Sequence, residues 1–398
     1  MRAFYHLVFF ILLVVGCQCE QHLYAHGPFG KAHLSVEIPT PFNCNRSIGI
    51  FSRSIRAPSI RITELQVSST NYSNMEIIHV SWTPTFTPCK DDFIGIYFVE
   101  IPAATGKKEV SFLKKNYVLF RLGGCDYVDF EFVKAGQNTS VWTMLNLRRQ
   151  LEFRYYSRDA KCTGKYTFIA KSPIVQPINA NEPTQVHLAF GDRNDQIYVS
   201  YVTNSSEVIP QCQYGLNSSS FNFQVNGTTT TYKASDMCEG KANRTGPQNF
   251  INPGYMHTIL LNDLRPSATY YYRVGSNEHG WSRTFQFTNR PSTLNTMTHI
   301  LAYGDMGVSP IQSGGKPTID RVLALAISDN VSGILHIGDV SYARGIGALR
   351  EGFMTQIEPT ASRFPYMVGI GNHEYDHVTG GDKDPSGAPG PGGFRPAW

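Results

Sequence analysis

Three short apolar runs near the C-terminal end of the chain each stop at a glycine that polar residues follow. The runs are residues 299–303, 333–337 and 366–370. Asp305 and Asp339 follow the first two glycines and lie 34 positions apart, and Asn372 comes 33 positions after Asp339. This spacing is typical of a strand, a crossover and the next parallel strand. The pattern therefore predicts a parallel sheet whose polar tips meet at one carboxyl edge, where such folds place their sites.

The segment between the first two runs predicts the crossover helix. Within residues 318–329, Ile319, Val322, Leu323 and Ala326 recur at helical spacing and share one face. The runs themselves are short and apolar throughout, which is typical of parallel strands that are buried on both faces. This part of the chain is therefore expected to be α/β.

The polar tips combine side chains that bind hard metal ions. They are Asp305, Asp339, Tyr342, Asn372 and His373. Carboxylate, phenolate and carboxamide oxygens suit Fe(III), Mn(II), Mg(II) or an oxygen-rich zinc site. A carboxylate between two strands can bridge two cations roughly 3.5–4 Å apart, which activate a shared water for attack on a phosphoryl group. The sequence therefore predicts a dinuclear site for the hydrolysis of phosphate esters.

Each residue also has a purely structural explanation when it is taken alone. Asp305 and Asp339 would then serve as strand terminators, and Tyr342 would pack over a helix. His336 lies within an apolar run and is interpreted as a core histidine, and His377 as a surface residue. The order and spacing of the whole set favour the metal site.

The first residues have the pattern of a secretory signal. Arg2 gives a positive start, Phe4 to Val15 is almost wholly apolar, and residues 17–19 offer small side chains for cleavage. A membrane anchor is the alternative, but the apolar run is too short to span a bilayer comfortably. We therefore expect residues 1–19 to be a signal peptide and no stable membrane insertion after its removal.

Cysteines and glycosylation acceptors agree with an oxidising compartment. The cysteines that follow the signal are Cys44, Cys89, Cys125, Cys162, Cys212 and Cys238. We expect Cys212 and Cys238 to pair, whereas the other four permit three pairings that the sequence leaves open. The Asn-x-Ser/Thr acceptors are Asn45, Asn71, Asn138, Asn204, Asn217, Asn226, Asn243 and Asn330. The chain is therefore expected to be a glycoprotein that is secreted to the extracellular space or to the vacuole.

Length and charge limit the organisation of the chain. The 398 residues are enough for two or three domains. The net charge of +4, with 17% charged residues, gives no basic stripe for nucleic acid. Residues 20–175 and 176–292 alternate strand-like runs with turn residues, which predicts two all-β domains. A third domain is expected at residues 296–398, after a short linker.

Several strands can be placed inside the two β domains. Residues 76–82 and 93–98 are expected strands of the first. Residues 185–190 and 197–202 predict a hairpin in the second. Residues 264–274 resemble the corner and the penultimate strand of a fibronectin type III sandwich.

The motifs at the polar tips resemble the first three of five signature motifs of the purple acid phosphatases, which belong to the calcineurin-like metallophosphoesterases. The motifs are Gly304-Asp305-x-Gly307, Gly338-Asp339-x-x-Tyr342 and Gly371-Asn372-His373-Glu374. That family carries a fibronectin-like domain before its catalytic domain, and its long plant-type members carry a further β-rich region. The resemblance implies two all-β sandwich-like domains followed by the N-terminal portion of an α/β metallophosphoesterase domain.

The resemblance also implies a role for each motif residue. Asp305 and Tyr342 would bind a ferric ion, and Asp339 would bridge it to a divalent zinc, manganese or iron ion. Asn372 would bind the divalent ion and contact the phosphate of the substrate. His373 would be the catalytic residue and would touch the phosphate or the leaving group of the substrate. The implied activity is that of an acid phosphatase on phosphomonoesters, or on phosphoanhydrides such as nucleotide polyphosphates.

The fourth and fifth motifs of the family, Val-x-x-His and Gly-His-x-His, have no counterpart in the 24 residues after Glu374. Because their three histidine ligands are missing, we expect a fragment or truncated product that is inactive alone. The alternatives are a non-catalytic glycoprotein with a vestigial phosphoesterase domain, and a related phosphodiesterase or nucleotide pyrophosphatase. Tyr342 favours the ferric phosphatase. The expected partner is a small phosphorylated substrate, and the oligomeric state is left open, with a homodimer as one option.

Overall fold

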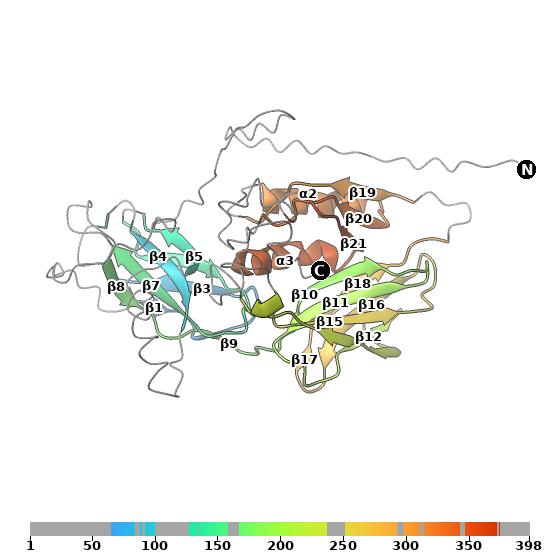
Figure 1. Cartoon of the computed structure of the whole chain (residues 1–398), viewed down its shortest axis with the longest axis horizontal. Coiled ribbons are helices and arrows are strands. Elements are labelled where there is room, and N and C mark those ends of the chain that lie inside the picture. Colours follow the sequence, from blue (N-terminus) through green and yellow to red (C-terminus); the bar gives the residue numbers. More distant parts are fainter. Residues whose placement is uncertain are drawn as a thin grey trace, which may run out of the picture. The chain divides into compact units, whose positions relative to one another are not determined.

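The computed structural model describes the chain in segments. They are residues 65–83, 88–89, 92–99, 127–134, 136–157, 167–236, 251–292, 298–309, 312, 314–342, 347–371 and 374. These residues fall into two compact units, and the boundary lies between Ile178 and Asn179. Figure 1 colours the first unit from blue to green and the second from green to red.

The first unit is all β. One sheet has the strand order β1-β3-β6, a second has the order β5-β4-β7-β8, and β2 pairs with β9. The strands are β1 (Gln66–Val67), β2 (Asn71–Tyr72), β3 (Ile77–Ser81), β4 (Phe93–Phe98), β5 (Tyr127–Phe132), β6 (Thr139–Thr143), β7 (Leu151–Ser157), β8 (Thr167–Lys171) and β9 (Gln176–Pro177). Ile78, Trp142 and Phe153 belong to its buried core. The predicted strands at 76–82 and 93–98 are therefore confirmed.

The second unit begins with a β-sandwich. One sheet has the order β10-β11-β15-β14, and the other has the order β13-β12-β16-β17 with β18 also paired to β16. The elements are β10 (Thr184–Phe190), β11 (Ile197–Thr203), β12 (Gln211–Gly215), β13 (Phe223–Asn226), β14 (Thr228–Thr230), the 3₁₀ helix η1 (Ala234–Asp236), β15 (Tyr255–Leu261), β16 (Thr269–Ser276), β17 (Gly280–Trp281) and β18 (Phe285–Thr288). Alternate side chains of both sheets, including Val199, Ile259 and Tyr272, fill one core.

Two local predictions about this sandwich are confirmed. Strands β10 and β11 pair antiparallel, with Leu188 opposite Val199. The hydroxyl of Tyr270 accepts a hydrogen bond of 2.9 Å from the backbone N–H of Arg265. That bond closes the corner before β16, as in fibronectin-like sandwiches.

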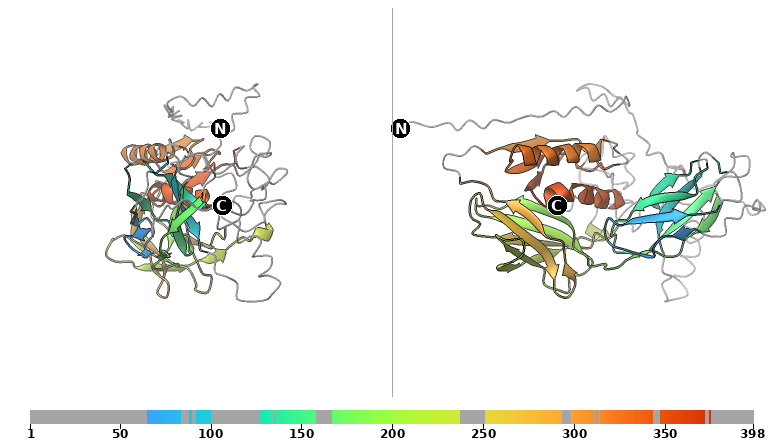
Figure 2. Two further views of the ribbon diagram at one scale, coloured as in Figure 1. Left: turned by 90° about the vertical axis from the view of Figure 1, so that its left-hand side faces the viewer. Right: turned by 180° about the vertical axis from the view of Figure 1, so that it is seen from behind.

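A three-stranded parallel sheet follows in the same unit. Its strands β19 (Ile300–Tyr303), β20 (Gly333–His336) and β21 (Tyr366–Val368) are adjacent in that order. Helix α2 (Gly315–Ser328) connects the first pair, and helix α3 (Gly347–Ala361) connects the second. The three strands and the first helix agree with the sequence prediction. Figure 2 shows the helices and this sheet from behind.

Both helices pack on the same face of the parallel sheet. The buried cluster takes Ile319 and Val322 from α2, Phe353 and Ile357 from α3, and Ile334 from β20. The other face is less covered, since Ile337 is 63% exposed. The core therefore lies between the helices and one side of the sheet, and the polar loops project from its carboxyl edge.

The cysteine prediction needs a correction. Cys212 is a free cysteine and is wholly buried. It belongs to the sandwich core, where burial raises the pKa of its thiol. The predicted Cys212–Cys238 disulfide is wrong in this structure, because the Cys212 side chain packs inward as a small apolar group. Cys89 is disulfide-bonded, and the remaining predicted cysteines, Cys44, Cys125, Cys162 and Cys238, lie outside the described residues.

The predicted glycosylation acceptors that the structure describes are all exposed. They are Asn71, Asn138, Asn204, Asn217, Asn226 and Asn330. Asn45, Asn243 and the predicted signal peptide at residues 1–19 lie outside the described residues. Within the described segments, no helix has the length and apolar character that crossing a bilayer requires.

Candidate metal centre

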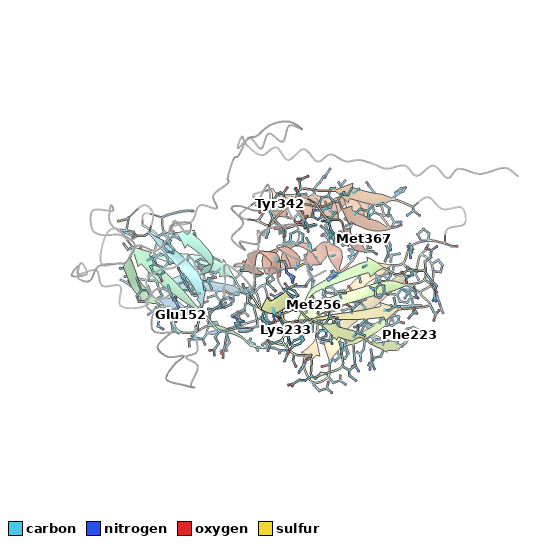
Figure 3. All side chains as sticks on the ribbon, in the orientation of Figure 1. Glu152, Phe223, Lys233, Met256, Tyr342 and Met367 are labelled. Carbon is cyan, nitrogen blue, oxygen red and sulfur yellow. The ribbon has the colours of Figure 1, made fainter. Side chains whose placement is uncertain are left out.

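Two loops at the carboxyl edge of the parallel sheet bring three oxygen donors together. Asp305 follows β19, and Asp339 and Tyr342 follow β20. The hydroxyl of Tyr342 donates to Oδ1 of Asp305 at 2.6 Å and lies 3.1 Å from Oδ2 of Asp339. Tyr342 is labelled in Figure 3, among the side chains of the parallel sheet and its helices. The predicted convergence of these three residues is therefore present.

All three residues have a backbone conformation that side chains rarely adopt. The φ angles of Asp305, Asp339 and Tyr342 are 56°, 50° and 49°. The left-handed region costs an ordinary residue about 1–2 kcal/mol, and aspartate tolerates it better than a bulky tyrosine. Strain of this kind collects at functional sites, where the surrounding structure holds it in place.

Backbone hydrogen bonds tie the first loop to the second. The N–H of Asp305 donates to the carbonyl of Gly338 at 3.3 Å, and the N–H of Gly307 donates to the carbonyl of Val340 at 3.0 Å. These bonds extend the pairing of β19 and β20 past the ends of the strands. The two acidic side chains are thereby kept side by side.

Glu374 ties the second loop to the third, and sequence reasoning assigned it no role. Its carboxylate accepts from the N–H groups of Asp339 and Val340 at 2.8 Å each, and from that of Gly371 at 3.0 Å. A carboxylate that accepts several backbone N–H groups makes strong, charge-assisted bonds. The available signal was an acidic residue two positions after Asn372, inside the third motif.

Glycine is required where these loops meet. A Cβ on Gly371 would lie 2.2 Å from Oδ1 of Asp339 and 2.3 Å from its backbone N. Gly338, whose φ is +75°, would place a Cβ 2.5 Å from Cα of Gly371. The glycines that lead each predicted tip therefore allow the backbone to approach closely.

The electrostatics of the cluster keep the phenol protonated. Burial raises the pKa of Tyr342, and the hydrogen bond to Asp305 and the negative charge of Asp339 raise it further. Asp339 is 8% exposed, whereas Asp305 is exposed. One proton thus lies between two carboxylates, at a place where a hard cation would find oxygen donors of the same kind. This donor chemistry fits an ion such as Fe(III).

The structure tests only part of the predicted ligand set. Asn372 and His373 lie outside the described residues, as does His377. Over the described segments, no group of three or more His, Cys, Asp or Glu side chains is placed to hold a metal ion. The donors that the structure does bring together are two carboxylates and one phenol.

His336 is a core residue, as the sequence predicted. It is 1% exposed, and its Nδ1 lies 2.7 Å from the hydroxyl of Tyr366. Tyr366 also hydrogen-bonds to Tyr303, whose ring stacks on His336. Burial lowers the pKa of His336 to about 4 and outweighs the opposing charge of Asp305. The imidazole is therefore neutral and belongs to a buried aromatic layer behind the loops.

Comparison with known proteins identifies similar sequences and folds. Residues 183–289 match the model of the purple acid phosphatase N-terminal domain. Probable inactive purple acid phosphatase 9 of Arabidopsis thaliana is 34% identical over 325 residues, which cover 76% of this chain and 47% of that protein. Acid phosphatase type 7 of Mus musculus is 30% identical over 195 residues, which cover 48% of this chain and 40% of that protein.

A solved structure has the same fold. A purple acid phosphatase from yellow lupin (Lupinus luteus) seeds superimposes with a TM-score of 0.64 at 22% identity, over 79% of this chain and 57% of that one. The matches to the Arabidopsis relatives include about three quarters of this chain. They span only about half the length of each relative.

Proposed function

The chain is a relative of the purple acid phosphatases, and on that premise we propose that its parallel sheet carries the first part of a dinuclear phosphatase site. The observation that carries the proposal is the contact of the Tyr342 hydroxyl with both Asp305 and Asp339. Few structural roles require a phenol to lie between two carboxylates on strained backbone. A hard cation would be bound by such a group of oxygen donors.

In this proposal each residue has a defined task. Asp305 and Tyr342 hold a ferric ion, Asp339 bridges it to a divalent zinc, manganese or iron ion, and Asn372 holds the divalent ion. Such a pair of ions supplies an activated water and neutralises charge on the phosphoryl group. Asn372 and His373 orient the phosphate, and the substrates are phosphomonoesters or phosphoanhydrides. The proposed compartment is the secretory pathway, and the exposed asparagine acceptors suit a glycoprotein.

The test compares Tyr342→Phe with Tyr271→Phe in the full chain supplied with Fe(III) and Zn(II). Tyr271 lies on strand β16 of the sandwich, so Tyr271→Phe removes a tyrosine hydroxyl that is not part of the candidate site. We expect the wild type and Tyr271→Phe to show the visible absorption of an iron–tyrosinate pair. Tyr342→Phe should lose the absorption. Equal iron absorption in the two variants would contradict the proposal.

The second candidate is a non-catalytic secreted glycoprotein. The observation that favours it is that several relatives of this chain, among them those numbered 27, 9 and 1 from Arabidopsis thaliana, have "inactive" in their names. This candidate predicts a folded, glycosylated chain that shows no iron–tyrosinate absorption. The same assay therefore separates the two candidates.

A further inference from the structure

Helix α3 lies between the β-sandwich and the loop that carries Asp305. On its sandwich side, Glu351 accepts a hydrogen bond from the side-chain amide of Gln185. Glu358 accepts one from the backbone N–H of Val186 at 3.2 Å. Glu351 is 4% exposed, so the first of these bonds is shielded from water.

Two further contacts fix the end of the helix on the sandwich. The hydroxyl of Tyr272, which is fully buried, donates to the carbonyl of Ser362 at 2.6 Å. Arg283 lies 3.4 Å from the carboxylate of Glu358. Strand β10 is bulged where it meets α3, and Gln185 takes a φ of 58° there. The sandwich therefore contacts α3 along its length through polar groups.

On the opposite side of α3, Gln356 hydrogen-bonds to the loop that carries Asp305. The side chain of Gln356 accepts from the N–H of Ser309 at 2.9 Å and donates to the carbonyl of Gly307 at 3.0 Å. At 3.6 residues per turn, Gln356 points roughly 140° away from Glu351 and roughly 160° away from Glu358. The helix thus contacts the sandwich on one side and the loop on the other.

The peptide groups around Gly307 are held from both directions. Its N–H donates to Val340 in the second loop, and its carbonyl accepts from Gln356. Gly307 has a φ of +72° and lies two residues after Asp305. Asp305 is exposed, and its carboxylate accepts a hydrogen bond from Tyr342. The direction of its backbone also depends on how the residues that follow it are fixed.

We propose that Gln356 is a positioning residue for the candidate metal centre, and that the sandwich fixes the position of Asp305 because it holds α3 in place. Gln356 touches neither metal nor substrate, and it acts by holding residues 305–309 against the second loop. The role of Gln356 in metal binding rests on the proposed function, whereas its hydrogen bonds to residues 307 and 309 do not. The domain at residues 183–289 then supports the candidate site, because its Tyr272 hydrogen-bonds to the residue that follows α3.

Hydrogen exchange of the full, metal-free chain tests this inference, with Gln356→Ala compared with Arg321→Ala. Arg321 is an exposed residue of α2 and serves as the control for loss of a long polar side chain. We expect exchange in residues 305–309 to become about tenfold faster in Gln356→Ala, since two hydrogen bonds are lost. Exchange in strands β19 and β20 should stay as in the wild type.

A second variant, Gln356→Glu, keeps the acceptor for Ser309 and loses only the donor to Gly307. Its exchange should lie between those of the wild type and Gln356→Ala. If Gln356→Ala exchanges like Arg321→Ala, or if its exchange rises equally across the whole unit, the positioning role is wrong.

The link to the sandwich is tested by Tyr272→Phe against Tyr271→Phe. Loss of the bond to Ser362 should speed exchange in residues 305–309 about threefold, and the neighbouring Tyr271→Phe should leave it unchanged. Equal exchange in the two variants would overturn the part assigned to the sandwich.

The release of Fe(III) to a chelator, which is expected to be faster in Gln356→Ala, adds a readout of the site. A wild type that binds no iron would contradict the proposed function alone, because exchange is measured without metal.

Discussion

At the scale of single residues, the site consists of side chains on backbone that is costly to form. Asp305, Asp339 and Tyr342 each have a positive φ, which costs the tyrosine about 1–2 kcal/mol relative to ordinary backbone and the aspartates less. Hydrogen bonds between the loops offset this cost, and the carboxylate of Glu374 supplies several of them. Substitutions at these positions should therefore affect both the fold of the loops and the binding of metal.

The loops approach each other closely at Gly371 but not at Gly369. Alanine substitutions at these two nearby glycines should therefore have very different effects on metal binding. Gly371→Ala would place a methyl group against the Asp339 carboxylate, whereas Gly369→Ala would meet its nearest atoms at 3.6 Å. We expect Gly371→Ala to bind Fe(III) at least tenfold more weakly than the wild type, because Asp339 must move. Gly369→Ala should bind it normally. Similar affinities of the two variants, measured by iron titration, would contradict this explanation.

The carboxylate of Glu374 predicts a loss of stability when it is removed. Glu374→Ala leaves the N–H groups of Asp339, Val340 and Gly371 without their acceptor. Bonds to a charged group contribute about 1.5–3 kcal/mol each when buried, and these are partly exposed, so we expect a loss of about 2 kcal/mol in unfolding free energy. Urea unfolding measures it, with Glu278→Ala in an exposed turn as the control. An unchanged midpoint for Glu374→Ala would show that water replaces the carboxylate.

At the scale of elements, the local sequence predicts helix α2 but not helix α3. Helix α2 has apolar residues at helical spacing and was expected at residues 318–329, close to its observed bounds. Helix α3 was not predicted, because Gly347, Gly352 and Pro359 weaken its helical propensity. Its stability comes from Phe353 and other residues packed into the shared core, which a local pattern does not reveal.

The sandwich strand β15 predicts a pH dependence through His257. This side chain is 2% exposed and lies between the hydroxyls of Thr203 and Thr229, at 2.8 and 2.9 Å. Burial lowers its pKa to about 4, and the neighbouring His279 acts in the same direction. The unfolded chain takes up a proton below about pH 6.5, and the folded chain does so only near pH 4. Stability from this group is therefore present above about pH 6.5 and is lost on acidification towards pH 4.

His257→Gln should reduce this acid sensitivity. The largest expected effect is about 3 kcal/mol between neutral pH and pH 4. Urea unfolding at about pH 7 and about pH 4.5 measures it. His299→Gln is the control, because His299 is exposed. If His257→Gln destabilises the protein equally at both pH values, the histidine does not set the pH dependence.

At the scale of the whole molecule, the described chain forms two units that have separate cores. The first is centred on residues such as Phe153 and Tyr155. The second contains a sandwich core and a parallel-sheet core, which α3 and β10 bring into contact. The sequence placed a domain boundary at residues 292–296, whereas the structure groups both sides of it in one compact unit.

This organisation predicts two unfolding transitions. Phe153→Ala removes a fully buried ring from the first unit and should cost about 3–5 kcal/mol there. Calorimetry should show one transition shifted to lower temperature and the other unchanged. Phe287→Ala, in the sandwich core, is the matched variant and should shift the other transition. A single transition that moves in both variants would contradict independent units.

The sequence by itself determined the three parallel strands, several strands of the β domains, helix α2 and the meeting of Asp305, Asp339 and Tyr342. These follow from local periodicity and from the rule that parallel strands end at one edge, so neighbouring residues suffice to infer them. Tertiary structure alone decided the free state of Cys212, the formation of α3, and the roles of Gln356 and Glu374. Those features depend on which distant side chains share a core or face a particular backbone group, and the contacts that decide them join segments far apart in the sequence.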